Sequence, residues 1–214
     1  MTKLAFLLLL ACGPASAQSI SYEEFTLPNG FRVFLIRDAS VPVVSLTLAV
    51  AAGSRDESPW LSGFAHLFEH LMFEGSVHVP RGGFDRILEA HGAASNASTH
   101  NDFTFYYETL PSNALALAAW LDADRLSALD VSEKNMRTQV DVVKEEIRQS
   151  VDNRPYIPLL WYEVPGRVFS NWANQHPALG TFEDLDRATL KEARRFFDRH
   201  YAPSNLLMAV AGDF

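Results

Sequence analysis

The stretch GFAHLFEHLMFEG, residues 63–75, places two histidines and a glutamate inside an otherwise apolar segment. Its apolar residues recur at helical spacing, which predicts a helix over about 60–74. His66, Glu69 and His70 share one side of that helix, because residues three and four positions apart are neighbours on a helix surface. The opposite side is expected to be buried, and it contains Trp60, Leu61, Phe64, Leu67, Phe68, Leu71 and Met72.

The polar side of this helix has the composition of a metal site. Two histidines one turn apart can both present a ring nitrogen to one Zn²⁺ ion, and imidazole is a favoured zinc ligand. A carboxylate beside them, Glu69 here, can hold and deprotonate a water molecule. The alternative is that all three are solvated residues on a helix surface. A hydrolytic zinc site also needs a third protein ligand, which directs attention to acidic residues on other helices.

A second helix, predicted over 133–150, supplies a candidate for that ligand. Relative to its buried stripe, Glu145 points away, whereas Glu146 lies about 90° round, at the edge of the core. Glu146 can therefore reach a site between packed helices, unless it is an ordinary glutamate at the core boundary. The stripe itself recurs at helical spacing and consists of Met136, Val140, Val143 and Ile147.

The rest of the chain mixes expected strands and helices. The turn dipeptide Asn29-Gly30 between two extended runs predicts a hairpin. Further strands are expected over 42–53, at two places within 94–111, and over 205–214. Further helices are expected over 84–91, over 113–129 with Ser112 as its cap, and from Asp186 or Thr189 to about Tyr201, while Ser132 caps the helix over 133–150. The remaining histidines have no partner pattern and are expected at the surface or in loops: His78, His91, His100, His176 and His200.

Composition bounds the kind of protein this can be. The chain has 214 residues, 48% of them hydrophobic, and a net charge of −8. Such a chain can bury a core, which excludes a disordered polymer. An acidic balance argues against nucleic acid as a partner, since nucleic-acid binding usually needs a basic face. Without an internal repeat, low-complexity run or clear linker, residues 18–214 are expected to form a single α+β domain.

The first seventeen residues, MTKLAFLLLLACGPASA, resemble a secretory signal peptide. A short apolar run follows a single lysine, and Ala15-Ser16-Ala17 provides a small-residue cleavage site. We therefore expect export to the periplasm or secretion. An alternative reading is a lipoprotein anchored through Cys12, the only cysteine, which follows Leu9-Leu10-Ala11.

Several separated motifs together resemble the pitrilysin/insulinase family of zinc metallopeptidases, the inverzincins. His66-Leu67-Phe68-Glu69-His70 inverts the commoner His-Glu-x-x-His order. Glu146 follows at about the distance at which that family places its third ligand. The supporting stretches are GFAHLFEHLMFEGS, SNASTHNDFTFYY, VVKEEI and YAPSNLLMAVAGDF, in the family's order from about residue 24 to the end of the sequence.

The resemblance implies both a fold and a reaction. The fold is a mitochondrial-processing-peptidase-like domain in which a mixed or antiparallel sheet packs against helices. His66, His70 and Glu146 would bind one Zn²⁺ ion and Glu69 would act as general base, hydrolysing peptide bonds through a metal-activated water. The family's substrate-binding edge strand matches 94–99, where Asn96 and Ala97 would hold the peptide backbone, although Asn96 alone could simply shape a turn.

Two departures from the family pattern qualify these expectations. Many relatives carry a glutamate seven residues before the third ligand, and here that position is Gln139, on the same side of the helix as Glu146. Active relatives also pair two such domains or subunits around a peptide chamber. The sequence is therefore expected to be the zinc-binding N-terminal domain of a zinc endopeptidase or oligopeptidase, truncated at its C-terminal end. The enzyme would act on a peptide or unfolded polypeptide. It would do so together with a second homologous domain or subunit. The alternatives are a weak or inactive partner subunit and a structural-zinc or lipid-anchored surface module.

Overall fold

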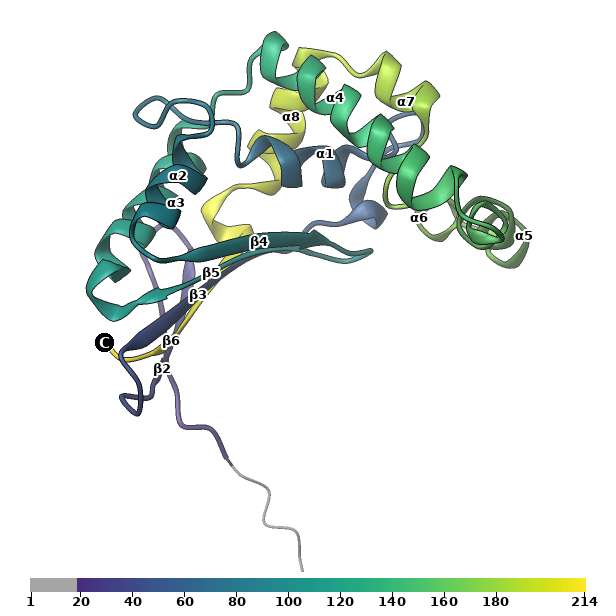
Figure 1. The fold of residues 1–214 in the computed structure, drawn as a ribbon. Coiled ribbons are helices and arrows are strands. Elements are labelled where there is room, and N and C mark those ends of the chain that lie inside the picture. Colours follow the sequence, from purple (N-terminus) through teal and green to yellow (C-terminus); the bar gives the residue numbers. More distant parts are fainter. Residues whose placement is uncertain (1–18) are drawn as a thin grey trace, which may run out of the picture.

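The computed structural model describes residues 19–214. The predicted signal peptide and Cys12 lie outside the described residues. Six strands form one mixed sheet in the order β1-β2-β6-β3-β5-β4 (Figure 1). Every neighbouring pair is antiparallel except β2 and β6, which are parallel. The strands are β1 (Glu23–Thr26), β2 (Arg32–Arg37), β3 (Val43–Val50), β4 (Ala94–Thr99), β5 (Thr104–Pro111) and β6 (Leu206–Gly212).

The helices gather on one face of this sheet (Figure 1). On the central strands β3 and β5, the residues on that face are buried and alternate with more exposed ones. This is the α+β arrangement of a mixed sheet packed against helices that the sequence predicts. The helices are α1 (Phe64–Leu71), α2 (Gly83–Ala90), α3 (Leu115–Ala128), α4 (Glu133–Ile147), α5 (Val164–Val168), α6 (Trp172–Gln175), α7 (Phe182–Arg187) and α8 (Leu190–His200).

The predicted hairpin is confirmed as β1 and β2. Gly30 has φ +91°, a left-handed conformation that glycine adopts without steric cost. The Asn29 side chain accepts a hydrogen bond from the Phe31 N–H and closes the turn.

The helix predicted over 60–74 is shorter than expected. It begins at Phe64, because Trp60 and Gly63 both have positive φ angles, 73° and 88°, that a helix cannot include. Trp60 is consequently 71% exposed and does not belong to the buried side, which corrects the sequence prediction. The remaining apolar residues of α1, including Phe64 and Phe68, are buried as predicted.

The capping predictions have mixed outcomes. The Ser132 hydroxyl caps α4 as expected. Thr189 opens α8 with a capping box, which decides between the two candidate starts. Ser112 does not cap α3, which begins at Leu115, because the Ser112 hydroxyl donates to Asp213 instead.

A buried ionic cluster ties α3 to the sheet. Arg125 on α3 lies 2.8 Å from the Glu108 carboxylate on β5 and 2.6 Å from Asp122, one turn earlier on α3. Its guanidinium also lies over the Phe84 ring, 4.1 Å from the centroid. Burial and the nearby Asp122 raise the pKa of Glu108 to about 8, so this carboxyl holds a proton far more strongly than an exposed glutamate does.

Within residues 19–214, every helix is too short or too polar to cross a bilayer.

Candidate metal centre

The beginning of α1 is fixed by a buried carboxylate. Glu57 accepts hydrogen bonds from the N–H groups of Gly63, at 3.0 Å, and Ala65, at 2.8 Å. These are among the donors that a helix start leaves without partners inside the helix. Gly63 is required here, since a Cβ at this position would lie 2.7 Å from the Leu179 carbonyl oxygen. The loop before α1 therefore sets the position of the first turn, which contains His66.

His176 supports Glu57 from a segment more than one hundred residues away. Its Nε2 lies 3.0 Å from the Glu57 carboxylate and 2.8 Å from the Ser54 carbonyl, and its Nδ1 lies 2.7 Å from the Trp172 carbonyl. Both ring nitrogens therefore face acceptors, which favours the doubly protonated ring. Burial alone would lower the pKa of His176, but the hydrogen bonds with Glu57, Trp172 and Ser54 and the charge of Glu57 together outweigh it and raise that pKa. His176 lies in the loop after α6, one of the two places expected for it, but its side chain is only 3% exposed and so is not a surface residue.

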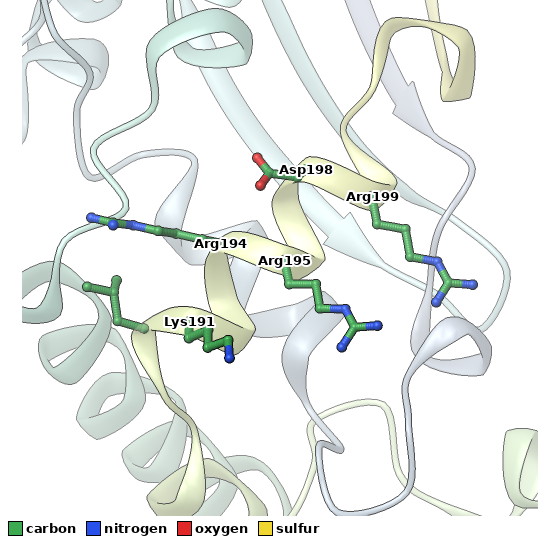
Figure 2. A pocket seen from close by; sticks show the side chains of 6 residues that line it. Lys191, Arg194, Arg195, Asp198 and Arg199 are labelled. Carbon is green, nitrogen blue, oxygen red and sulfur yellow. The ribbon is translucent and has the colours of Figure 1, made fainter.

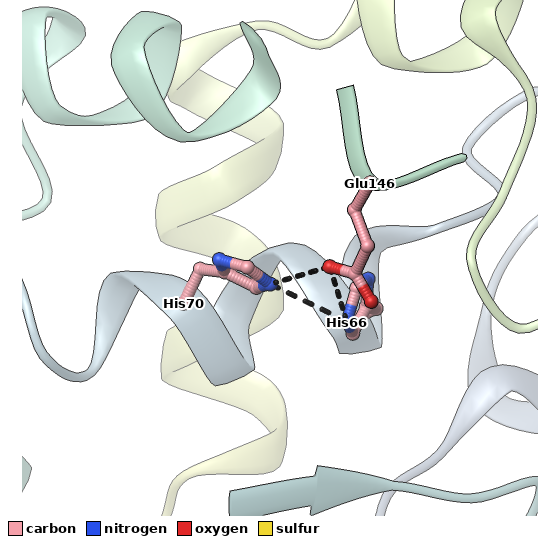
Figure 3. A group of neighbouring side chains, drawn as sticks. All are labelled: His66, His70 and Glu146. Carbon is pink, nitrogen blue, oxygen red and sulfur yellow. Dashed lines mark hydrogen bonds and ion pairs between the residues drawn. The ribbon is translucent and has the colours of Figure 1, made fainter. Parts of the chain in front are cut away.

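His66, His70 and Glu146 converge from two packed helices (Figure 3). His66 Nε2 lies 3.3 Å from His70 Nε2 and 3.6 Å from the Glu146 carboxylate, while His70 Nε2 lies 3.3 Å from the same carboxylate oxygen. Ligand atoms about 2.0–2.1 Å from a tetrahedral zinc ion stand about 3.3–3.4 Å apart. The three side chains therefore have the chemistry and the spacing of a zinc site.

The charges at this cluster suit a divalent cation. Burial and the neighbouring His70 lower the pKa of His66 to about 4, so its ring is neutral at physiological pH. The hydrogen bond with His70 lowers the pKa of Glu146, so that carboxyl is ionised. Neutral imidazole and carboxylate are the forms that bind metal.

Glu69 stands beside the cluster and is held from the sheet. The Thr99 hydroxyl, at the end of β4, donates a hydrogen bond to its carboxylate. Burial raises the pKa of Glu69 above its ordinary value. A carboxylate with this environment is suited to accept a proton during a reaction, and the hydrogen bond from Thr99 fixes its direction.

A chain of polar groups continues behind His70. The Gln139 side-chain oxygen lies 3.2 Å from His70 Nδ1, and its amide nitrogen lies 2.6 Å from the Glu74 carboxylate. Arg81 pairs with the other oxygen of Glu74, at 2.5 Å. His66 differs, since its Nδ1 is buried without a hydrogen-bond partner among residues 19–214.

Asn96 and Ala97 lie on β4, the last strand of the sheet. β4 pairs with β5 on one side only, so its other edge carries backbone groups available to an added strand. The Asn96 side chain accepts a hydrogen bond from the Ala97 N–H. The same strand ends at Thr99, whose hydroxyl donates to Glu69, so the unpaired edge of β4 leads directly to the Glu69 carboxylate.

Sequence reasoning missed several supporting residues of this site. Thr99 closes a strand that the sequence does predict, so its place near the zinc-motif helix could have been proposed. Glu57 and Glu74 lie outside the motif in sequence, and their partners His176 and Gln139 are distant along the chain. Contacts between residues so far apart produce no periodic pattern in the sequence, so neither pair could be predicted from it.

A separate basic surface runs along α8. Figure 2 shows Arg195 and Arg199 pointing the same way, one turn apart, with Arg194 directed elsewhere. Together with Lys191 they line a shallow depression, and within residues 19–214 none of these four forms an ion pair. With no histidine and only Asp198 among its acidic residues, this depression lacks a metal-ligand set and is not the candidate active site.

Two histidines and a glutamate on packed helices are a donor set that mononuclear zinc hydrolases use, and here a second glutamate lies beside them. Comparison with known proteins agrees with this class. The model for the insulinase family, peptidase family M16, matches residues 32–160. The chain belongs to this family.

Individual relatives give the same result. The chain is 32% identical to "Zinc protease PqqE" of Helicobacter pylori over 98% of its own length and 48% of that protein. A solved protease from Helicobacter pylori superposes with a TM-score of 0.87 at 30% identity, covering 92% of this chain and 47% of that one. A peptidase M16 inactive domain from Pseudomonas fluorescens superposes with a TM-score of 0.82 at 19% identity, covering 91% and 47%.

The coverage of these relatives, and the inactive domain among them, limit what can be concluded about activity from the fold. The chain spans about half the length of the curated relatives it matches. Because the Pseudomonas domain has the same fold and is described as inactive, the fold alone does not decide activity. The functional argument therefore depends on the side chains of this chain.

Proposed function

We propose that this domain hydrolyses peptide bonds as a zinc-dependent endopeptidase or oligopeptidase. The observation that supports this most directly is the convergence of His66, His70 and Glu146 at the ligand spacing of tetrahedral zinc, with Glu69 outside the ligand set. One zinc ion bound there would polarise the scissile carbonyl and lower the pKa of water, as zinc does in other hydrolases.

Glu69 is the proposed general base. Its carboxylate takes a proton from the attacking water and passes it to the leaving amine. Its raised pKa suits both steps, since the carboxyl must hold a proton briefly and release it. The Thr99 hydroxyl keeps the carboxylate aimed while the proton moves.

β4 is the proposed binding edge for the substrate, a peptide or unfolded polypeptide. An extended peptide can add to its unpaired edge through backbone hydrogen bonds, with Asn96 and Ala97 among the contacting residues. Backbone pairing carries little side-chain selectivity, so this mode predicts broad sequence preference. Thr99 at the end of the same strand would bring the bound backbone alongside Glu69.

A second homologous domain or subunit is the proposed partner. The chain matches about half of each curated relative. The outer edge of β4 is unpaired within residues 19–214, and the side chains of His70 and Glu146 are 22% and 37% exposed, so a second body could pack over them. Residues 18–214 would then act as the zinc-binding domain of a larger enzyme. Export to the periplasm or outside the cell is proposed from the signal-like residues 1–17.

The test combines metal content with turnover of an unstructured fluorogenic peptide. Glu146→Gln should lose zinc, whereas Glu69→Gln should keep zinc and lose hydrolysis. Glu145→Gln is the matched control for Glu146, because Glu145 is one position along α4 and 55% exposed. Purified wild-type protein without zinc, or a Glu69→Gln variant that cleaves at the wild-type rate, would contradict the proposal.

The competing function is a peptide-binding or assembly subunit without turnover. Gln139 favours it, because an amide beside His70 lacks the charge of a carboxylate. In this case the protein binds zinc and peptide, and mixing it with a homologous half produces cleavage that Glu69→Gln does not reduce.

A further inference from the structure

We propose that Glu74 is a positioning residue that fixes the tautomer of His70 through the Gln139 amide. The inference depends on the zinc site proposed above, and it assigns a role to a residue outside that ligand set. It is argued from the hydrogen-bond chain behind His70.

The first step concerns the direction of the amide. The Gln139 amide nitrogen lies 2.6 Å from Glu74 Oε1. An ionised carboxylate can only accept hydrogen bonds, so the group facing it must be the NH₂ of Gln139. The charge on Glu74 therefore turns the Gln139 oxygen toward His70.

The second step concerns the imidazole. The Gln139 oxygen lies 3.2 Å from His70 Nδ1, and an amide oxygen can only accept. His70 must therefore carry its proton on Nδ1. In the neutral ring this leaves the lone pair on Nε2, the atom that faces His66 and Glu146 and that a metal would take. Without a metal, a proton on Nε2 can donate to the Glu146 carboxylate 3.3 Å away, so the position that Gln139 fixes is the proton on Nδ1.

The third step concerns the Gln139 amide when residue 74 carries no negative charge. If residue 74 offers no obligatory acceptor, the Gln139 amide can rotate and donate to His70 Nδ1. The proton then moves to Nε2, where it blocks the position that a metal would take. Glu74 selects between two arrangements of the same side chains, and the ligating one is favoured only while its carboxylate is charged.

The surroundings of Glu74 hold the carboxylate in this role. Arg81 pairs with its second oxygen at 2.5 Å, and the Glu74 side chain is only 12% exposed. The other histidine has no equivalent support, because His66 Nδ1 lacks a partner among the described residues. The chain Arg81–Glu74–Gln139–His70 is therefore the one connection that orients a histidine of the cluster from behind.

The test measures zinc affinity by competition with a chromophoric chelator. Loss of an outer-shell partner typically weakens metal binding 10–100-fold; because Glu74 acts one hydrogen bond farther away, Glu74→Gln should weaken it about tenfold. The double variant Glu74→Gln/Gln139→Glu returns a carboxylate to the His70 hydrogen bond and should restore the affinity. Glu183→Gln, which removes an exposed charge paired with Arg187, is the control and should leave affinity unchanged.

Two further measurements separate positioning from structure. Arg81→Gln tests whether loss of the ion pair alone reproduces the effect, and urea midpoints confirm that each variant folds. A Glu74→Gln variant with wild-type affinity, or a double variant that binds zinc as weakly as the single one, overturns the proposal.

Long-range proton–nitrogen NMR spectra of the metal-free protein give a readout that does not depend on zinc. Wild type should show a proton on His70 Nδ1, whether or not Nε2 also donates to Glu146, and Glu74→Gln should lose part of the Nδ1 protonation. If wild-type protein binds no zinc, the proposed function fails while this measurement still decides the role of Glu74. A wild-type ring without a proton on Nδ1 contradicts the inference.

Discussion

Glu57→Gln should destabilise the domain strongly, although Glu57 lies outside the metal motif. The variant leaves a neutral amide where a fully buried carboxylate accepts bonds from Gly63, Ala65 and His176. The side chains of Glu57 and His176 are 0% and 3% exposed, so neither can turn to water. Removing one partner of a buried pair costs about 3–5 kcal/mol, a large part of the roughly 5–15 kcal/mol that stabilises a domain.

The assay is urea unfolding of the metal-free protein followed by tryptophan fluorescence. Glu163→Gln, which breaks an exposed pair with Arg167, serves as the control and should give no measurable change. A double-mutant cycle with His176→Gln isolates the pair, and the two single effects should sum to more than the effect of the double variant. A loss below about 1 kcal/mol for Glu57→Gln, or strictly additive effects, would refute the reasoning.

The same pair should give a characteristic pH dependence. Because the folded pKa of His176 is raised, its stabilising contribution is complete below the unfolded pKa near 6.5 and is lost as pH rises through the folded pKa. The destabilisation caused by His176→Gln should therefore be largest below pH 6.5 and shrink at higher pH. A difference between the two proteins that stays constant over this range would contradict the assignment of the charged ring.

Two further variants test other contacts. Thr99→Val should lower kcat for peptide hydrolysis about tenfold with zinc content unchanged, because Glu69 loses the hydrogen bond that orients it. Thr99→Ser keeps the hydroxyl and should retain most activity. Equal rates for both variants would exclude this role for Thr99. Arg125→Met should cost about 3–5 kcal/mol in urea unfolding, because Glu108 and Asp122 lose their buried counter-charge. Glu108→Gln should cost far less, since Asp122 still balances the arginine, and equal losses for the two variants would contradict this reasoning.

The metal cluster could be predicted from sequence because its signals are local. The spacing of His66 and His70 is a property of one helix, and the edge position of Glu146 follows from the apolar stripe of another. That the chain forms one α+β domain followed from alternating and apolar runs, whereas the mixed sheet packed against helices was implied by the family resemblance. What the sequence did not reveal depends on contacts between distant segments.

The start of α1 is the clearest example. Helical periodicity continues through Trp60, but the positive φ angles of Trp60 and Gly63 exclude both from the helix. The Glu57 carboxylate and the close approach of Leu179 to Gly63 hold this start in place. Glu74 escaped notice for the same reason, since its partner Gln139 belongs to a different helix. Residues that orient a site through tertiary contacts cannot be recognised from the sequence next to them, because the contact leaves no local pattern.

The position of β6 has a consequence for how the chain acquires its fold. β2 and β3 are consecutive in sequence but do not pair, because β6 lies between them, with Arg32 opposite Leu207 and Val50 opposite Leu206. The β1–β2 hairpin therefore has no sheet to join until residues 206–212 have been synthesised. Contacts this far apart form slowly, since most of the chain must be closed into a loop first. The hairpin should thus remain undocked during synthesis until β6 has emerged and can pair with both β2 and β3.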